Sequence, residues 1–209
     1  MGCGRGDTGQ AFPAYVAAVT GLLFLGFAYF LVAQAAVTRN DAQTAADAAA
    51  LAAAQDAREQ LRAGWLDVIL DPSQWGAFVR GQEFFSSPAC ASAADLAVKN
   101  GAAMSDCLDI TAEGSRGFSV TVRTTGADAE QATASADAVV EARCTFEAPD
   151  PTPPPTPTEP AEGEEGDDGE EEEPGPITGL SCRGEPWVID PVDPELPDIA
   201  DLFTVRLSD

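Results

Sequence analysis

An uncharged stretch near the N-terminus is the feature that most limits what this chain can fold into. Residues 8–38 contain no charged side chain, although the 209-residue chain carries 35 acidic and 11 basic side chains. Between Ala11 and Val37 the only polar residues are one threonine, one glutamine and two tyrosines. A helix over this run would be about 40 Å long, and the hydrocarbon core of a bilayer is about 30 Å thick. The run therefore predicts a transmembrane helix over residues 11–38.

This run has two other interpretations, a buried core helix and a cleaved secretory signal. A buried core helix seldom lacks charge on every face over such a length. A cleaved secretory signal is the stronger alternative, because Ala33-Gln34-Ala35 has the small-x-small form of a cleavage site and Arg5 precedes the apolar run. The run is longer than such signals usually are, and the helical pattern continues beyond it. We therefore expect a retained anchor, with cleavage after Ala35 as the alternative.

Residues 39–64 continue the helix outward. Eleven alanines stand between Ala42 and Ala63, no proline occurs, and Gly64 follows as a stop signal. Alanine offers little apolar area but allows a neighbouring helix or sheet to approach closely. We expect this part to pack on its own domain. Small residues within the span are expected to face other helices, and they are Ala17, Gly21, Ala28 and Ala35.

This region resembles a known family. Gly9-Gln10 precedes the apolar span, and Asn40, Gln43 and the string from Ala45 to Ala54 follow it. The combination resembles the N-terminal region of TadE/TadG-like proteins of tight-adherence (Flp) pilus assembly, over about residues 9–54. The residues that carry the resemblance are Gly9, Gln10, Asn40, Gln43, Ala46, Asp47, Ala48, Ala49 and Leu51.

The resemblance implies a single-pass protein of the cell membrane that works in pilus assembly or the associated secretion. Residues 1–10 would be cytoplasmic, the C-terminal domain extracellular, and the partners other pilus-assembly or pilin-like subunits. Pilins cut by prepilin peptidase carry a glutamate five residues after the glycine, whereas Ala14 stands there after Gly9 and Ala11 after Gly6. We therefore infer that the helix remains uncleaved, as in TadG-like members.

Composition excludes several functions. The net charge of −24 opposes contact with phosphate backbones, so we expect no nucleic-acid partner. The absence of histidine removes the usual general base, Ser-His and Cys-His nucleophiles, and histidine metal sites. Carboxylate pairs such as Asp67 and Asp71 are plentiful in so acidic a chain and are attributed to surface solvation. We expect no enzymatic activity, no cofactor and no small-molecule substrate.

The five cysteines divide unequally around the span. Cys3 precedes it, and an even set of four follows it, as expected for an oxidising compartment. This asymmetry favours a cytoplasmic N-terminus. Four cysteines allow three pairings, and we favour two disulfides between sequence neighbours. A zinc site of four thiolates is the alternative, but no CxxC occurs and we expect no metal site. The favoured pairs are Cys90 with Cys107 and Cys144 with Cys182.

Residues 65–148 and 177–209 are predicted to form an exported α+β domain. Helical patterns occupy Trp65–Leu70, Trp75–Val79 and Cys90–Gly101, and alternating patterns predict strands at 108–112, 118–124, 138–146, 187–189 and 202–207. We expect about five antiparallel strands in one sheet on which the long helix packs, a pilin-like architecture.

Residues 149–176 interrupt this domain. They contain nine prolines and eleven carboxylates with no basic residue, so they are predicted to form a disordered linker. A bond between Cys144 and Cys182 would hold both ends of this linker together. The spacing of its carboxylates matches no EF-hand loop, so we expect no calcium site in this linker.

Overall fold

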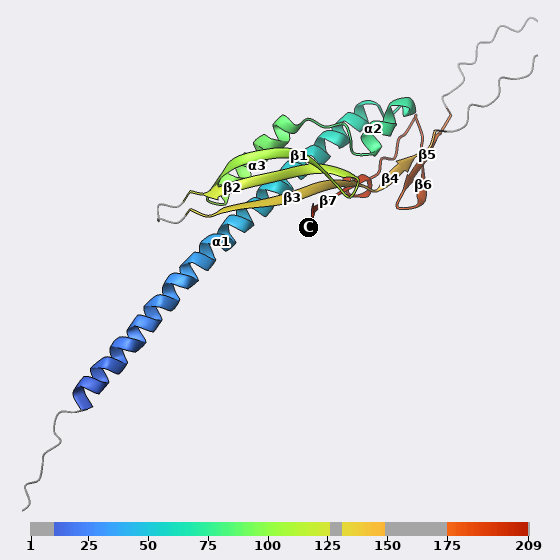
Figure 1. Ribbon diagram of the computed structural model, residues 1–209. Helices are drawn as coiled ribbons and strands as arrows, with labels where there is room; N and C mark the ends of the chain where they lie inside the picture. Colours follow the sequence, from blue (N-terminus) through green and yellow to red (C-terminus); the bar gives the residue numbers. More distant parts are fainter. Residues whose placement is uncertain (1–10, 126–130, 149–174, 209) are drawn as a thin grey trace, which may run out of the picture.

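The computed structural model describes residues 11–125, 131–148 and 175–208 and shows an α+β protein built on one long helix (Figure 1). Helix α1 (Ala11–Asp67) has 57 residues, and no glycine or proline interrupts it between residues 27 and 63. Of the described residues, none before Ala42 is buried. The remaining elements gather around the second half of α1, and its first half stands bare (Figure 1). Predictions for residues 1–10 and 149–174 fall outside the described residues.

Helix α1 continues past the glycine that the sequence suggested as its stop. Gly64 lies against the ring of Phe78, and a Cβ at this position would collide with that ring. The next residue, Trp65, is buried in the core. Gly64 therefore serves close packing inside the helix, which ends three residues later. Two short helical segments follow, η1 (Pro72–Gln74) and α2 (Trp75–Val79).

A four-stranded antiparallel sheet covers one side of α1. Its strand order is β1-β2-β3-β7, and Glu113-Gly114 forms the turn between the first two strands. Both turn residues have positive φ, as tight hairpin turns require. Alternation in the second strand places three side chains, Phe118, Val120 and Val122, in the core. The strands are β1 (Ala102–Ala112), β2 (Ser115–Thr124), β3 (Thr133–Ala142) and β7 (Phe203–Ser208).

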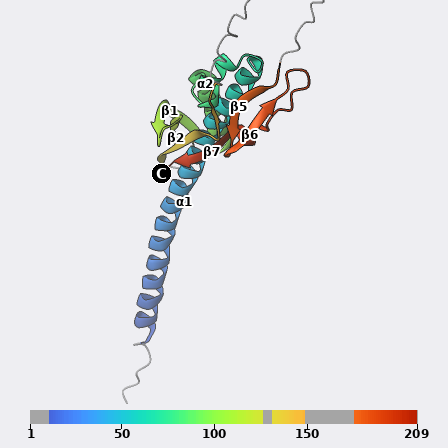
Figure 2. The same ribbon diagram turned by 90° about the vertical axis from the view of Figure 1, so that its right-hand side faces the viewer.

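A second sheet of three strands lies at the end of α1 far from the bare half (Figure 2). The single sheet expected from the sequence is thus divided, because the alternating run 138–146 changes partner at Arg143. Ala142 pairs with Phe203, whereas Cys144 pairs with Cys182. The strands are β4 (Cys144–Phe146), β5 (Ile177–Cys182) and β6 (Glu185–Ile189), and α4 (Ile199–Leu202) leads into β7.

Alanine dominates the contact between α1 and its neighbours. Helix α3 (Ser86–Lys99) packs beside α1 and buries Ala89, Ala93 and Ala97, and strand β3 buries Ala136 and Ala138. Small side chains on both sides of a contact allow backbones to approach closely. The alanines of α1 with no exposed surface are Ala42, Ala45, Ala46, Ala49, Ala50, Ala53, Ala54 and Ala57.

This packing predicts opposite outcomes for two neighbouring substitutions in α3. Ala93→Leu should lower the free energy of unfolding by about 1–3 kcal/mol, because the larger side chain has no room at a fully buried position. Ala91→Leu, on the exposed side of the same helix, should change it little. Urea unfolding of the full chain in detergent, followed by tryptophan fluorescence, measures both. Equal effects of the two substitutions would contradict close packing of α3 on α1.

Candidate functional site

Residues 11–41 of α1, called the bare half, contact no other element closely enough to be buried and form an exposed apolar surface. An 18-residue window within it has a mean hydropathy of 2.3, and none of that window is buried. Its aromatic side chains stand open, with Phe12 73%, Phe24 70% and Tyr29 77% exposed. Exposure of so large an apolar surface to water is energetically unfavourable, and exposed apolar surfaces of this size are typical of sites that contact lipid or protein. By length and composition, this helix can cross a membrane.

The four small residues proposed for helix contacts lie on this bare half. At 100° per residue, Ala17, Gly21, Ala28 and Ala35 fall within about 40° of one another around the helix axis. A Cβ added at Gly21 would meet nothing within 4 Å, so this face is open in the structure.

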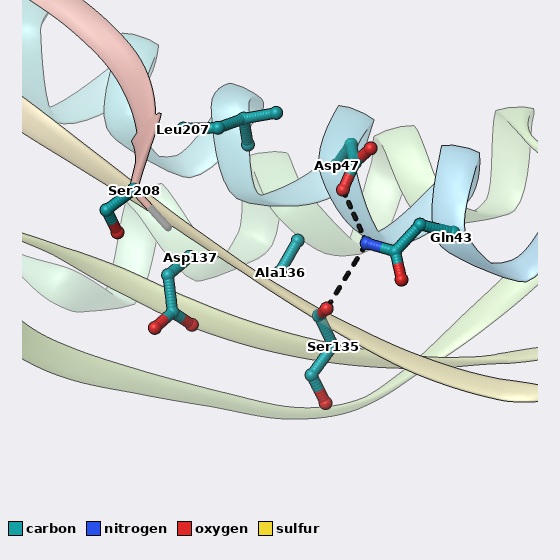
Figure 3. Close-up of a pocket in the computed structure, with 7 residues that line it drawn as sticks. All are labelled: Gln43, Asp47, Ser135, Ala136, Asp137, Leu207 and Ser208. Atoms are coloured by element: carbon teal, nitrogen blue, oxygen red, sulfur yellow. Dashed lines mark hydrogen bonds between the residues drawn. The ribbon is translucent and has the colours of Figure 1, made fainter.

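A pair of hydrogen bonds made by Gln43 to Asp47 and Ser135, called the clasp, joins α1 to the sheet where the bare half ends. Nε2 of Gln43 donates to Oδ1 of Asp47 at 2.7 Å and to the backbone oxygen of Ser135 at 3.3 Å (Figure 3). One turn earlier, the backbone oxygen of Asn40 accepts a hydrogen bond from the Thr44 hydroxyl at 2.9 Å. The clasp joins the first covered turn of α1 to the start of β3.

An open cleft of about 460 Å³ surrounds the clasp. Besides Gln43, Asp47 and Ser135 it is lined by Ala136, Asp137, Leu207 and Ser208. The Asp137 and Ser208 side chains point away from Gln43 and Asp47, so the polar groups do not converge on one point (Figure 3). The arrangement fits a structural contact better than a ligand site.

The residues of the sequence resemblance divide between core and surface. Ala46 and Ala49 are fully buried. Asp47, Ala48 and Leu51 are half-buried, and the polar Asn40 and Gln43 are exposed near the end of the bare half. Gly9 and Gln10 lie outside the described residues. The alanines of the motif thus contact the domain, and its polar residues mark where the helix enters it.

Two disulfides stabilise the part of the chain that follows the apolar run. Cys90 is bonded to Cys107, which links α3 to β1, and their Cα atoms are 6.0 Å apart. Cys144 is bonded to Cys182, which links β4 to β5. Across residues 11–125, 131–148 and 175–208, no group of three or more histidine, cysteine or acidic side chains is placed to hold a metal ion. Cys3 lies outside these residues.

A charged cluster that no sequence pattern predicts lies on the outer face of the first sheet. Arg206 of β7 pairs with Glu141 of β3 and with Glu113 in the β1–β2 turn. The hydrogen bond to Glu113 is the main cause of a raised pKa of Arg206. These partners are 65 and 93 residues distant in sequence, so no local pattern reveals them.

One comparison with known proteins bears on this region. Residues 9–56 match the Flp pilus-assembly TadE/G-like family. The match confirms the resemblance of the N-terminal region, and it covers the bare half of α1 together with the alanine-rich turns that pack on α3 and β3. No curated protein and no solved structure matched the chain.

The clasp predicts a measurable contribution from Gln43. Gln43→Ala should lower the free energy of unfolding by about 0.5–1.5 kcal/mol, because it removes the hydrogen bonds to Asp47 and Ser135. Gln55→Ala is the matched control, since Gln55 is exposed on the same helix and its side chain makes no hydrogen bond within the described residues. Urea unfolding of both variants in detergent tests this. Equal stability of the two would show that the clasp contributes nothing.

Proposed function

We propose that this protein is a single-pass, membrane-anchored component of Flp pilus assembly or the associated secretion, and that it acts through protein contacts. The observation that carries the proposal is the coincidence of two features in one helix. The family match over residues 9–56 includes a helix half that is apolar and bare. A helix segment that is apolar on all sides and long enough to cross the hydrocarbon core is accommodated by a lipid bilayer.

We assign the N-terminus to the cytoplasm and the domain from residue 42 onward to the outside. Both disulfides lie after the apolar run, and disulfides persist in oxidising compartments. The charges flanking the span are a weaker guide, because Arg39 on the outer side opposes Arg5 on the inner side.

Deletion of the gene should abolish or alter surface pili, because the family match concerns pilus assembly. Electron microscopy of the deletion strain, with the wild-type gene restored as the control, measures this. Fractionation should leave the protein in membranes after carbonate washing. Unchanged piliation and secretion in the deletion strain would contradict the proposed role, whatever the location of the protein.

Contacts within the membrane are proposed for the face that carries Gly21 and Ala28. In a Cys3→Ser background, Ala28→Cys should crosslink to a neighbouring helix, because small residues allow close approach. Leu22→Cys is the control, since it lies on another face of the same exposed helix. Equal crosslinking of the two cysteines in membranes would argue against a specific contact face.

The alternative is a secreted binding module released by cleavage after Ala35. One observation favours it: the buried core begins at Ala42, so a cut at that site would remove no buried residue of the domain. Intact mass of the protein from membranes and from the medium separates the two functions. A soluble product that begins at Ala36 would favour the secreted module.

A further inference from the structure

We propose that one end of the exported domain lies in the lipid headgroup layer of the membrane that holds α1. This end, called the proximal end, is formed by Lys99 and Asn100 at the C-terminus of α3, Arg123 and Thr125 at and just after the end of β2, and Thr133 at the start of β3. The proposal rests on the membrane anchoring put forward above. It adds a surface of the domain that contacts the membrane, and this contact sets the height and the orientation of the domain relative to the bilayer.

The continuity of α1 sets the height of the domain. Val37 is the last residue of the apolar run, and Gln43 follows six residues later, about 9 Å further along the axis. The hydrogen bond from Gln43 places Ser135 at that level. The headgroup layer is about 5–8 Å thick on each side of the bilayer. With Val37 at the outer edge of the hydrocarbon core, the domain therefore begins at the outer edge of the headgroup layer, with no stalk between the two.

The direction of β3 brings its first residue closer still. At the far end of the strand, Gly81 lies beside both the Val140 carbonyl and the Leu61 side chain, so β3 runs away from the bare half as α1 does. Thr133 precedes Ser135 by two residues and lies up to about 7 Å nearer the membrane. In Figure 1 the ends of β2 and β3 that flank residues 126–130 extend toward the bare half of α1.

The end of α3 belongs to the same surface. The backbone and the hydroxyl of Thr125 both donate to the carbonyl of Gly101, each at 3.0 Å, which holds the C-terminus of α3 against the end of β2. Val98, in the last turn of α3, is 68% exposed. An apolar side chain next to Lys99 suits an interface where lipid tails meet headgroups.

The chemistry of the proximal end fits zwitterionic headgroups. Arg123 and Lys99 are exposed, and neither forms an ion pair within the described residues. Asp95, which is also exposed, stands one helical turn before Lys99 on α3. Both signs of charge are thus present, so phosphate and amine groups both find partners. We expect contact without a requirement for anionic lipid.

Depth-dependent quenching tests this placement. The full chain with Cys3→Ser and Thr133→Cys carries a fluorophore at position 133 and is reconstituted in phosphatidylcholine vesicles with nitroxide-labelled headgroups. The label should lose most of its fluorescence. Val188→Cys is the control, because Val188 is 55% exposed in β6, at the opposite end of the domain, and a label there should keep its fluorescence. Replacing part of the lipid with phosphatidylglycerol should change neither result.

A second variant tests whether α1 sets the height. Seven alanines inserted after Thr38 would raise the domain by about 10 Å and turn it by only about 20°. Quenching at position 133 should then be lost. Equal quenching at positions 133 and 188, quenching that needs phosphatidylglycerol, or quenching that survives the insertion would each overturn the proposal. Extraction of the protein by carbonate would instead refute the anchor, so the two failures are distinguishable.

Discussion

The alanine contact between α1 and its neighbours is the constraint on which the rest of the structure depends. A single alanine buries little apolar area, so the contact along residues 42–57 of α1 does not rely on large side chains of the helix, which enter the core only at Leu61 and Trp65. It relies on close approach, with alanines of α3 and β3 facing alanines of α1. Close-packed interiors respond to the addition of even one methylene. The same alanine-rich turns fall within the family match, so the matched segment contains the helix surface that the domain packs against.

Sequence patterns that extend over only a few turns predict the long helix, α3 and the first hairpin. The uncharged run and the alanines predict α1, the pattern over Cys90–Gly101 predicts α3, and the alternation over residues 108–112 and 118–124 predicts the first hairpin. Each of these depends on backbone preferences or on periodicity within a few turns. The α+β class follows from them without knowledge of distant contacts.

The remaining features depend on contacts between distant residues. The run 138–146 alternates without interruption, yet the strands on either side of Arg143 belong to different sheets, because Phe203 and Cys182 offer separate partners. The sequence alone indicates that the helix stops at Gly64. In the structure the Phe78 ring packs against Gly64, and the helix continues to Asp67. Within the candidate site, the sequence resemblance includes Gln43 but not its partner Ser135, which lies 92 residues away. Periodicity carries no information about such pairs.

The disulfides and the long helix together determine which parts of the molecule are held in place relative to one another. The Cys144–Cys182 bond joins β4 and β5, the strands that precede and follow residues 149–174 in the chain, and both strands lie at the end of α1 far from its bare half (Figure 1). Near the bare half, the Gln43 clasp and the first buried alanine, Ala42, join the domain to a helix that has no glycine or proline from residue 27 to 63. A helix without such breaks bends only gently. Any reorientation of the bare half must therefore move the domain with it, because α1 contains no glycine or proline between them that could act as a hinge.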